Sequence, residues 1–110
     1  MPSVRSLLLL AALLPSCFAL GAVPARAQDE FGDLPPGPGQ EETYYACVAC
    51  HSIRLVTQQG LSREAWEETL VWMVEEQEMD PLEPDERELI LNYLADHITP
   101  EWHKQRLENR

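Results

Sequence analysis

A five-residue motif constrains this chain more than any other feature of its sequence. Residues 47–51 read Cys-Val-Ala-Cys-His, and C-x-x-C-H is the attachment signature of c-type haem. Two thiols at this spacing can add across the two vinyl groups on one edge of a porphyrin, and the next residue then places an imidazole over the iron. The sequence therefore predicts one covalent haem c, with Cys47 and Cys50 as its thioether anchors and His51 as the proximal iron ligand.

The first 27 residues have the pattern of a secretory signal peptide. Arg5 precedes the apolar run at residues 7–14, and Ala25-Arg26-Ala27 is an A-x-A cleavage site. The apolar run is far shorter than the ~20 residues that a membrane span needs. We therefore expect residues 1–27 to be cleaved, with Cys17 among them, and the mature protein to be periplasmic with no membrane span.

Removing the leader makes an acidic chain more acidic. The full sequence has 110 residues and a net charge of -11, and the leader holds two basic residues and no acids. The remaining 83 residues carry 6 basic and 19 acidic side chains, a net charge of -13. Such a chain is unsuited to nucleic acid, whose binding needs Lys and Arg to neutralise phosphates, and to anionic membrane surfaces. A domain this small often needs a disulfide, a metal or a cofactor to stabilise its fold, and a covalent haem would serve that purpose.

The rest of the chain predicts an all-α domain behind an extended arm. Residues 28–40 are rich in proline and glycine, so we expect an arm without regular structure before a domain at residues 41–110. The simplest expectation is a solvated tail, and the alternative is an arm that wraps the domain or touches a partner. Helical patterns cover residues 41–51, 62–78 and 84–98. Ser62 is a good N-cap, and Pro84 suits the first turn of a helix. Residues 52–61 are expected to form a loop, and Thr99 starts a short charged C-terminal segment.

Three other roles for the cysteine pair stay open from the residues alone. A thioredoxin-like dithiol needs a βαβ context, and no stretch of the chain alternates like a strand. A zinc site needs four ligands, for which only His97 and His103 remain after the motif. A plain disulfide is compatible with an exported protein. The motif, the export signal and the helical pattern together favour haem.

A second axial ligand is available from two methionines. An electron-transfer haem commonly pairs His with Met, which raises the reduction potential. Met73 lies on the apolar face of the second predicted helix, seven residues after Trp66, and Met79 lies near that helix's end. Either could equally fill a gap in the core, so the spacing alone leaves both open.

Several motifs together resemble one family of small cytochromes. They are Cys47-Val48-Ala49-Cys50-His51-Ser52, then Val56, Gln58 and Gln59, then Trp66 with Met73, and then Ile90-x-x-Tyr93-Leu94-Ala95. Over roughly residues 41–98, this pattern resembles the small monohaem class I cytochrome c subunits of periplasmic sulfite dehydrogenases, and it is similar to related haem domains of quinohaemoprotein dehydrogenases.

The resemblance implies a cytochrome c fold, with three to four helices packed around one covalently bound haem. The family's distal methionine follows its tryptophan by seven residues, which lands on Met73, with Met79 as the alternative. Residues 77–81 read Gln-Glu-Met-Asp-Pro, where relatives often have Tyr-Gly-Ala-Pro. The implied electron donor is a periplasmic molybdenum-containing dehydrogenase, and the implied acceptor is an oxidase or another cytochrome.

The function expected from the sequence is electron transport by a carrier that is not itself an enzyme, either as a free shuttle or as the cytochrome subunit of a dehydrogenase complex. The alternative is a haem-based ligand-binding protein or redox sensor without Met ligation. The expected pocket walls are Ile53, Leu55, Val56, Leu61, Trp66, Leu70, Leu91 and Leu94, and the candidate donors to the haem propionates are Arg54, Gln58 and Gln59. Six acids could steer the carrier toward a basic partner surface or could simply form a solvated face that keeps it soluble: Glu67, Glu68, Glu75, Glu76, Glu78 and Asp80.

Overall fold

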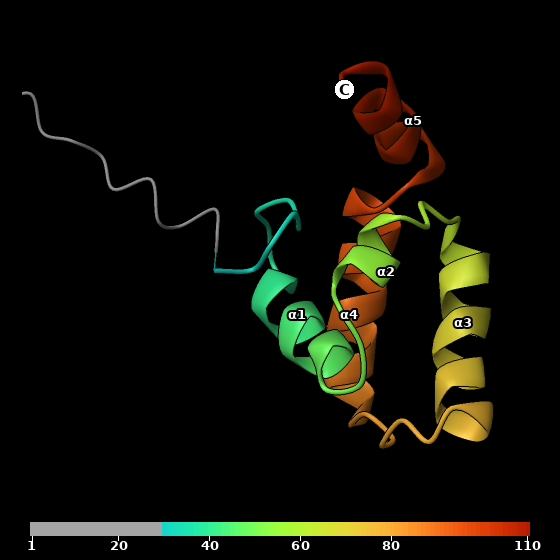
Figure 1. The fold of residues 1–110 in the computed structure, drawn as a ribbon. Helices are drawn as coiled ribbons and strands as arrows, with labels where there is room; N and C mark the ends of the chain where they lie inside the picture. The colour runs from blue at the N-terminus through green and yellow to red at the C-terminus, as the bar shows by residue number, and fades with distance from the viewer. Residues whose placement is uncertain (1–29) are drawn as a thin grey trace, which may run out of the picture.

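The computed structural model describes residues 30–110 of the chain. These residues form five helices and no strand (Figure 1). The helices are α1 (Gln40–Val48), α2 (Arg54–Thr57), α3 (Arg63–Glu76), α4 (Pro84–His97) and α5 (Pro100–Glu108). The all-α prediction is therefore confirmed for these residues. The expected three to four helices become five because the predicted loop contains one helical turn, α2, and the charged C-terminal segment forms α5. The predicted signal peptide, residues 1–27, lies outside the described residues.

Local capping signals place the helix starts where the sequence predicts them. The Ser62 hydroxyl accepts a hydrogen bond from the Ala65 amide at 3.3 Å, which satisfies one of the free donors at the start of α3. Pro84 occupies the first turn of α4, where its missing N–H costs nothing. Both predicted starts are confirmed. The ends differ, because α1 stops at Val48 and α3 at Glu76, before the predicted positions.

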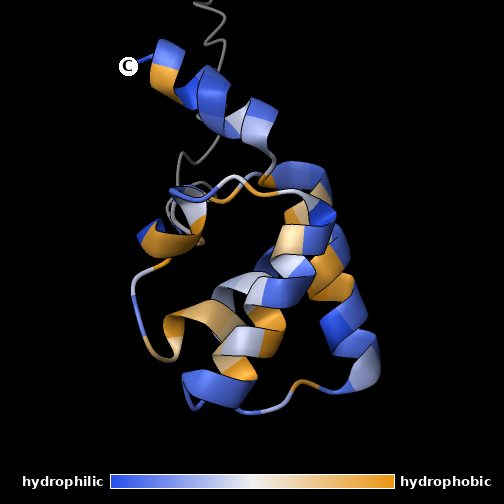
Figure 2. Cartoon of the chain, turned by 90° about the vertical axis from the view of Figure 1, so that its right-hand side faces the viewer, coloured by the Kyte–Doolittle hydropathy of each residue, from blue (hydrophilic) through white to orange (hydrophobic). Residues whose placement is uncertain are grey.

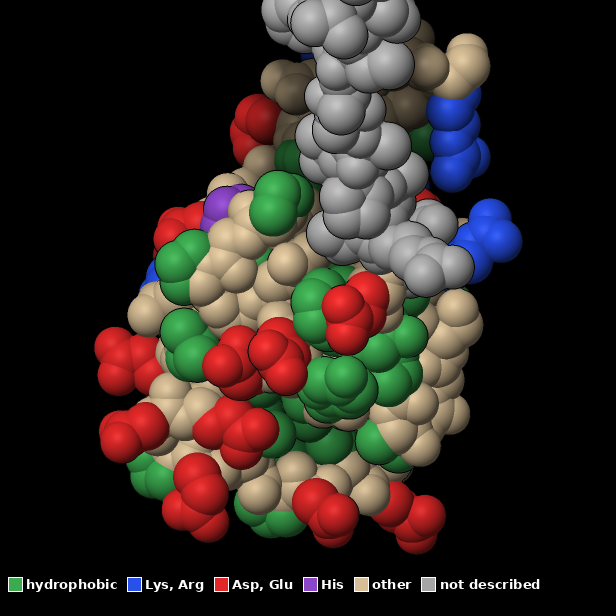
Figure 3. All heavy atoms as spheres, turned by 90° about the vertical axis from the view of Figure 1, so that its left-hand side faces the viewer, with side chains coloured by type: hydrophobic (Ala, Val, Ile, Leu, Met, Phe, Trp, Pro, Cys, Tyr) green, Lys and Arg blue, Asp and Glu red, His purple; other side chains and the backbone are tan. Residues whose placement is uncertain are grey.

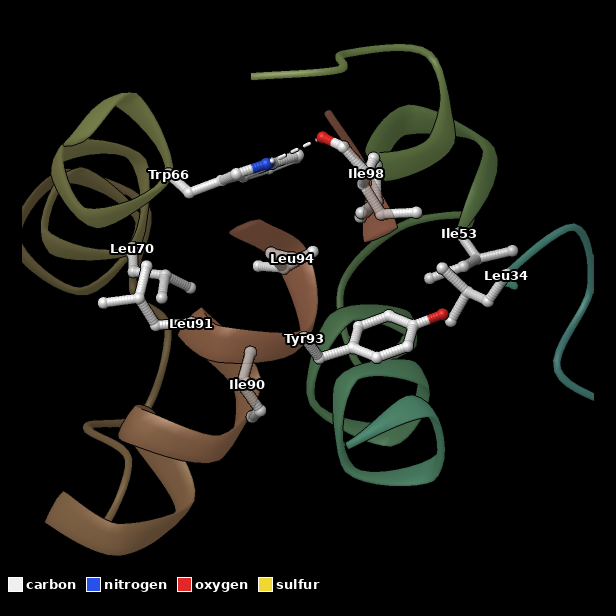
Figure 4. Close-up of a cluster of buried hydrophobic side chains, with 10 residues drawn as sticks. Leu34, Ile53, Trp66, Leu70, Ile90, Leu91, Tyr93, Leu94 and Ile98 are labelled. Carbon is white, nitrogen blue, oxygen red and sulfur yellow. Dashed lines mark hydrogen bonds between the residues drawn. The ribbon is translucent and has the colours of Figure 1, made fainter. Parts of the chain in front are cut away.

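Helix α4 is the centre of the molecule, since both α1 and α3 pack against it (Figure 1). Its residues Ile90, Tyr93 and Leu94 are at most 1% exposed, as the close-up in Figure 4 shows. Trp66 extends from α3 across the end of α4 and donates its indole N–H to the Ile98 carbonyl at 3.0 Å. A buried hydrogen bond thus fixes α3 against the end of α4.

The close contact between α1 and α4 depends on a glycine. Gly39 precedes α1 with φ of 91°, a left-handed conformation that costs glycine little. A Cβ atom there would lie 2.9 Å from Tyr93 Cβ and 3.0 Å from the Leu89 carbonyl oxygen. Any larger residue would therefore push the start of α1 away from α4.

The arm before α1 is packed onto the helices. Leu34 is only 4% exposed and belongs to the hydrophobic core. The Tyr93 hydroxyl donates to the Pro35 carbonyl, and the Gln40 side-chain amide donates to the Leu34 carbonyl at 2.9 Å. Figure 4 shows the Tyr93 ring pointing toward Leu34. The expectation of a solvated tail is wrong at Leu34 and Gly39, which are buried, although half of residues 30–39 are exposed. Proline and glycine prevent a helix here, but they do not prevent burial.

Helix α5 lies at the end of the molecule and is mainly hydrophilic (Figures 1 and 2). The Thr99 hydroxyl caps it by accepting from the Trp102 amide at 3.1 Å. Arg106 attaches it to the body by donating to the Thr57 carbonyl at 3.3 Å and pairing with Asp33 at 2.8 Å. Across residues 30–110, no helix has the length and apolar character to cross a membrane.

Candidate functional site

A cavity of about 590 Å³ contains the chemically distinctive residues of the sequence. Its walls come from the end of α1, from α2 and the loop after it, from α3 and the turn that follows, and from α4. The lining residues are Ala46, Cys47, Cys50, His51, Leu55, Val56, Gln59, Leu61, Trp66, Thr69, Leu70, Trp72, Met73, Gln77, Met79 and Leu94. The lining is mainly apolar, and the volume lies within the range of about 300–1,000 Å³ typical of cofactor sites.

The cysteine motif spans the end of α1. Cys47 lies in the last turn of the helix and is partly buried, whereas Cys50 follows the C-cap residue Ala49 and is exposed. Both cysteines are free thiols, and both line the cavity with His51. The early end of α1 therefore divides the motif, so that Cys47 is held by the helix and Cys50 and His51 by the turn after it.

Burial makes the two thiols chemically unequal. It raises the pKa of the Cys47 thiol to about 11, because the thiolate would lose hydration inside the protein. The thiolate is the reactive form of cysteine. In the folded chain Cys47 is therefore a poor nucleophile, and the exposed Cys50 is the more accessible thiol.

His51 is oriented by its neighbour. Its Nδ1 atom lies 3.2 Å from the Ser52 carbonyl oxygen. A carbonyl oxygen only accepts, so this hydrogen bond requires the proton on Nδ1 and leaves the Nε2 lone pair free. Histidines that bind metals through one ring nitrogen almost always donate the other N–H to such a group. The hydrogen bond thus suits His51 to ligate iron through Nε2.

Both candidate methionines border the same cavity as His51. Met73 projects from α3, and Met79 follows the turn after that helix. The Met79 amide donates to the Met73 carbonyl at 3.0 Å, and Glu78 between them has φ of 58°. This left-handed turn, unusual for a residue other than glycine, directs the chain back so that both thioethers line the cavity.

Most of the predicted pocket walls do line this cavity. Leu55, Val56, Leu61, Trp66, Leu70 and Leu94 are among the lining residues, whereas Ile53 and Leu91 are buried in the core elsewhere. Of the candidate propionate donors, Gln59 lines the cavity, but Arg54 and Gln58 line a second, smaller pocket.

Four lining residues were absent from the predicted walls, namely Ala46, Thr69, Trp72 and Gln77. Thr69 and Gln77 lie at helical spacing from Trp66 and Met73, and that spacing is the signal that could have found them. Trp72 is 50% exposed. Nothing in the helical pattern marks it, because it lies beside the apolar stripe and not on it.

The two remaining histidines lie away from the cysteines. The His97 ring packs on the Tyr93 ring with their centroids 4.8 Å apart, and His103 lies against Gly60. Neither histidine lines the cavity. Within residues 30–110, no three His, Cys, Asp or Glu side chains gather closely enough to hold a metal ion. The placement of these residues does not favour the zinc alternative.

The donors around the cavity match a covalently bound haem with two axial ligands. The motif supplies two thiols and an imidazole with a free Nε2 to the lining, α3 and its turn supply two thioethers, and most of the other lining side chains are apolar. Comparison of the chain with protein-family models, with curated proteins and with solved structures gives no match. Its function is therefore inferred from its own residues and their geometry.

Proposed function

We propose that the protein is a periplasmic one-electron carrier that holds one c-type haem in this cavity. The observation that carries the proposal is the convergence of Cys47, Cys50 and His51 with Met73 and Met79 around one mainly apolar cavity. These residues come from segments that are separate in the sequence, so the motif alone does not explain why they meet. An ordinary core would not collect two thiols, an imidazole and two thioethers around one hollow.

Each group has a distinct role in this proposal. Cys47 and Cys50 tether the haem by thioether bonds, His51 ligates the iron through Nε2, and Met73 is the distal ligand, with Met79 as the alternative. When bound, the haem supplies a ferric–ferrous couple. The apolar walls exclude water, and a drier site together with Met ligation raises the reduction potential. The chain itself catalyses no substrate chemistry.

The surface charge supports a protein partner with a basic docking face. Acidic side chains are prominent around hydrophobic ones on the face that Figure 3 shows. Such a charge distribution speeds encounter with an oppositely charged surface, and the association rate then falls as salt rises. The proposed donor is a periplasmic molybdenum-containing dehydrogenase, and the proposed acceptor is an oxidase or another cytochrome.

Covalent haem attachment tests the proposal directly. In a host that matures c-type cytochromes, the wild-type protein should keep its haem after denaturation, and Cys47→Ala/Cys50→Ala should carry none. Cys17→Ala is the matched control, since that cysteine belongs to the predicted leader, and it should keep full haem content. A colourless wild-type protein, or near-normal covalent haem in the double variant, would overturn the proposal.

The distal ligand is tested by two methionine variants of the haem-loaded protein. Met73→Leu should remove the weak long-wavelength band expected of ferric Met-ligated haem, and Met79→Leu should keep it. The reverse result would assign the distal position to Met79. If the wild-type protein lacks the band and binds carbon monoxide rapidly, the protein is instead a haem-based ligand-binding protein or redox sensor.

A further inference from the structure

A second, smaller pocket lies where α2, α5 and the N-terminal arm meet. Its volume is about 90 Å³, and it is lined by Asp33, Arg54, Thr57, Gln58, His103, Arg106, Leu107 and Arg110. After the predicted leader, the chain has only six Lys and Arg residues, and three of them line this pocket. A strongly acidic protein thus gathers half of its basic side chains around one hollow.

One of these arginines is already held in place. Arg106 donates to the Thr57 carbonyl at 3.3 Å, pairs with Asp33 at 2.8 Å and lies over the Trp102 ring at 4.6 Å. These contacts fix the guanidinium and use Asp33, the only acid in the lining, to balance its charge. Arg106 therefore forms a rigid wall of the pocket.

The other two arginines are not held by any acidic side chain that the structure describes. Among residues 30–110, neither Arg54 nor Arg110 makes an ion pair, and both side chains are exposed. Guanidinium groups present forked N–H donors that match oxyanions in geometry. Gln58 and His103 add further polar groups to the lining. The pocket thus combines positive charge with several donors that intramolecular contacts leave free.

We propose that this pocket binds one small tetrahedral oxyanion, such as inorganic phosphate or sulfate, between Arg54 and Arg110. The volume of about 90 Å³ equals roughly three water molecules at liquid density, which suits an anion of five heavy atoms. The site does not rest on the proposed haem function, because its lining includes no cysteine, no methionine and no residue that lines the larger cavity.

Binding would strengthen the attachment of α5 to the body. Arg54 belongs to α2 and Arg110 follows α5, so an anion between them links two elements that Arg106 already joins. Helix α2 also contributes Leu55 and Val56 to the larger cavity. Helix α2 therefore lines both the larger cavity and the smaller pocket, and an anion bound in the smaller pocket would hold α2 in place.

Calorimetric titration of the mature protein with inorganic phosphate tests the proposal. We expect saturable binding of one phosphate, weakened about tenfold or more in Arg54→Gln/Arg110→Gln. Arg63→Gln/Lys104→Gln removes the same charge outside the pocket and should bind as the wild type does. Binding that is absent from the wild type, or equally weakened in both double variants, would overturn the site and indicate only a general charge effect.

Three further measurements keep the test decisive: the affinity of a lysine variant, hydrogen exchange of α5 and the binding of acetate. Arg54→Lys/Arg110→Lys retains the charge without the forked geometry, and we expect its affinity to lie between those of the wild type and the Gln variant. Hydrogen exchange of α5 amides should slow when phosphate is added to the wild type. Acetate that binds more tightly than phosphate, or α5 exchange that is unaffected at saturating phosphate, would contradict the proposed occupant and its effect.

Discussion

At the scale of single residues, burial distinguishes the two cysteines of the motif. Cys47 is partly enclosed by the end of α1 and has a thiol pKa raised to about 11, whereas Cys50 is exposed. At neutral pH, this lowers the thiolate fraction of Cys47 more than about 100-fold below that of an ordinary thiol. If the proposed haem is attached at Cys47, we expect that attachment to precede complete folding, because the folded chain shields this thiol.

Alkylation of the haem-free protein measures this difference. We expect iodoacetamide to modify Cys50 at least about tenfold faster than Cys47 near neutral pH, because only thiolates react and Cys47 is also shielded. Mass spectrometry of the peptides against time gives the two rates. In denaturant, where burial is lost, the rates should converge. Equal rates in the folded protein would show that Cys47 is not desolvated.

A second residue-scale prediction concerns an unpaired buried hydroxyl. Thr43 in α1 is 0% exposed, and its Oγ1 atom has no hydrogen-bond partner. Thr43→Val keeps the shape and removes this group, so we expect the free energy of unfolding to rise by about 1 kcal/mol. Thr43→Ser keeps the hydroxyl and loses a packed methyl, which should lower it by about 1 kcal/mol. Urea denaturation that finds the Val variant less stable would contradict this account.

At the scale of elements, the arm is the segment whose role changes most between sequence and structure. Its contacts with α4 and α5 predict that it contributes to global stability. Leu34→Ala should lower the free energy of unfolding by about 2–4 kcal/mol, since it empties a core position. Leu107→Ala, at a 55% exposed position, is the matched control and should change it by less than about 0.5 kcal/mol. Equal effects would mean that the arm is not part of the core in solution.

The helices show which element features a sequence reveals. The starts of α3 and α4 were predictable because Ser62 and Pro84 act within one turn of their own positions. The turn α2 was missed because four residues are too few for a helical period to show. The end of α3 was placed too late, since Glu78 adopts a left-handed conformation that glycine would have signalled.

At the scale of the whole molecule, the buried Tyr93 side chain makes the free energy of unfolding fall as the pH rises into the alkaline range. Burial raises its pKa well above the ordinary value of about 10. Above pH ~10 the unfolded chain loses this proton while the native chain keeps it, so the native state binds more protons and stability falls as pH rises. One such group contributes a slope of at most about 1.4 kcal/mol per pH unit.

Denaturation at a series of alkaline pH values checks this linkage. Tyr93→Phe should be about 1 kcal/mol less stable near neutral pH, because its hydrogen bond to Pro35 is lost. Above pH ~10, its stability should fall less steeply than that of the wild type. Tyr45→Phe, at a 55% exposed position, serves as the control. A Tyr93→Phe profile parallel to the wild type would exclude Tyr93 as the titrating group.

The sequence by itself determined the features that act locally: the all-helical class, two helix starts and the grouping of two thiols with an imidazole at residues 47–51. Only the tertiary structure decided that Leu34 of the arm is buried, that Met73 and Met79 border the same cavity as His51, and that Arg54 and Arg110 line one pocket. The physical reason is the distance along the chain over which each interaction acts. Caps and motifs work within a few residues, whereas burial and convergence depend on surfaces from segments that are distant in the chain.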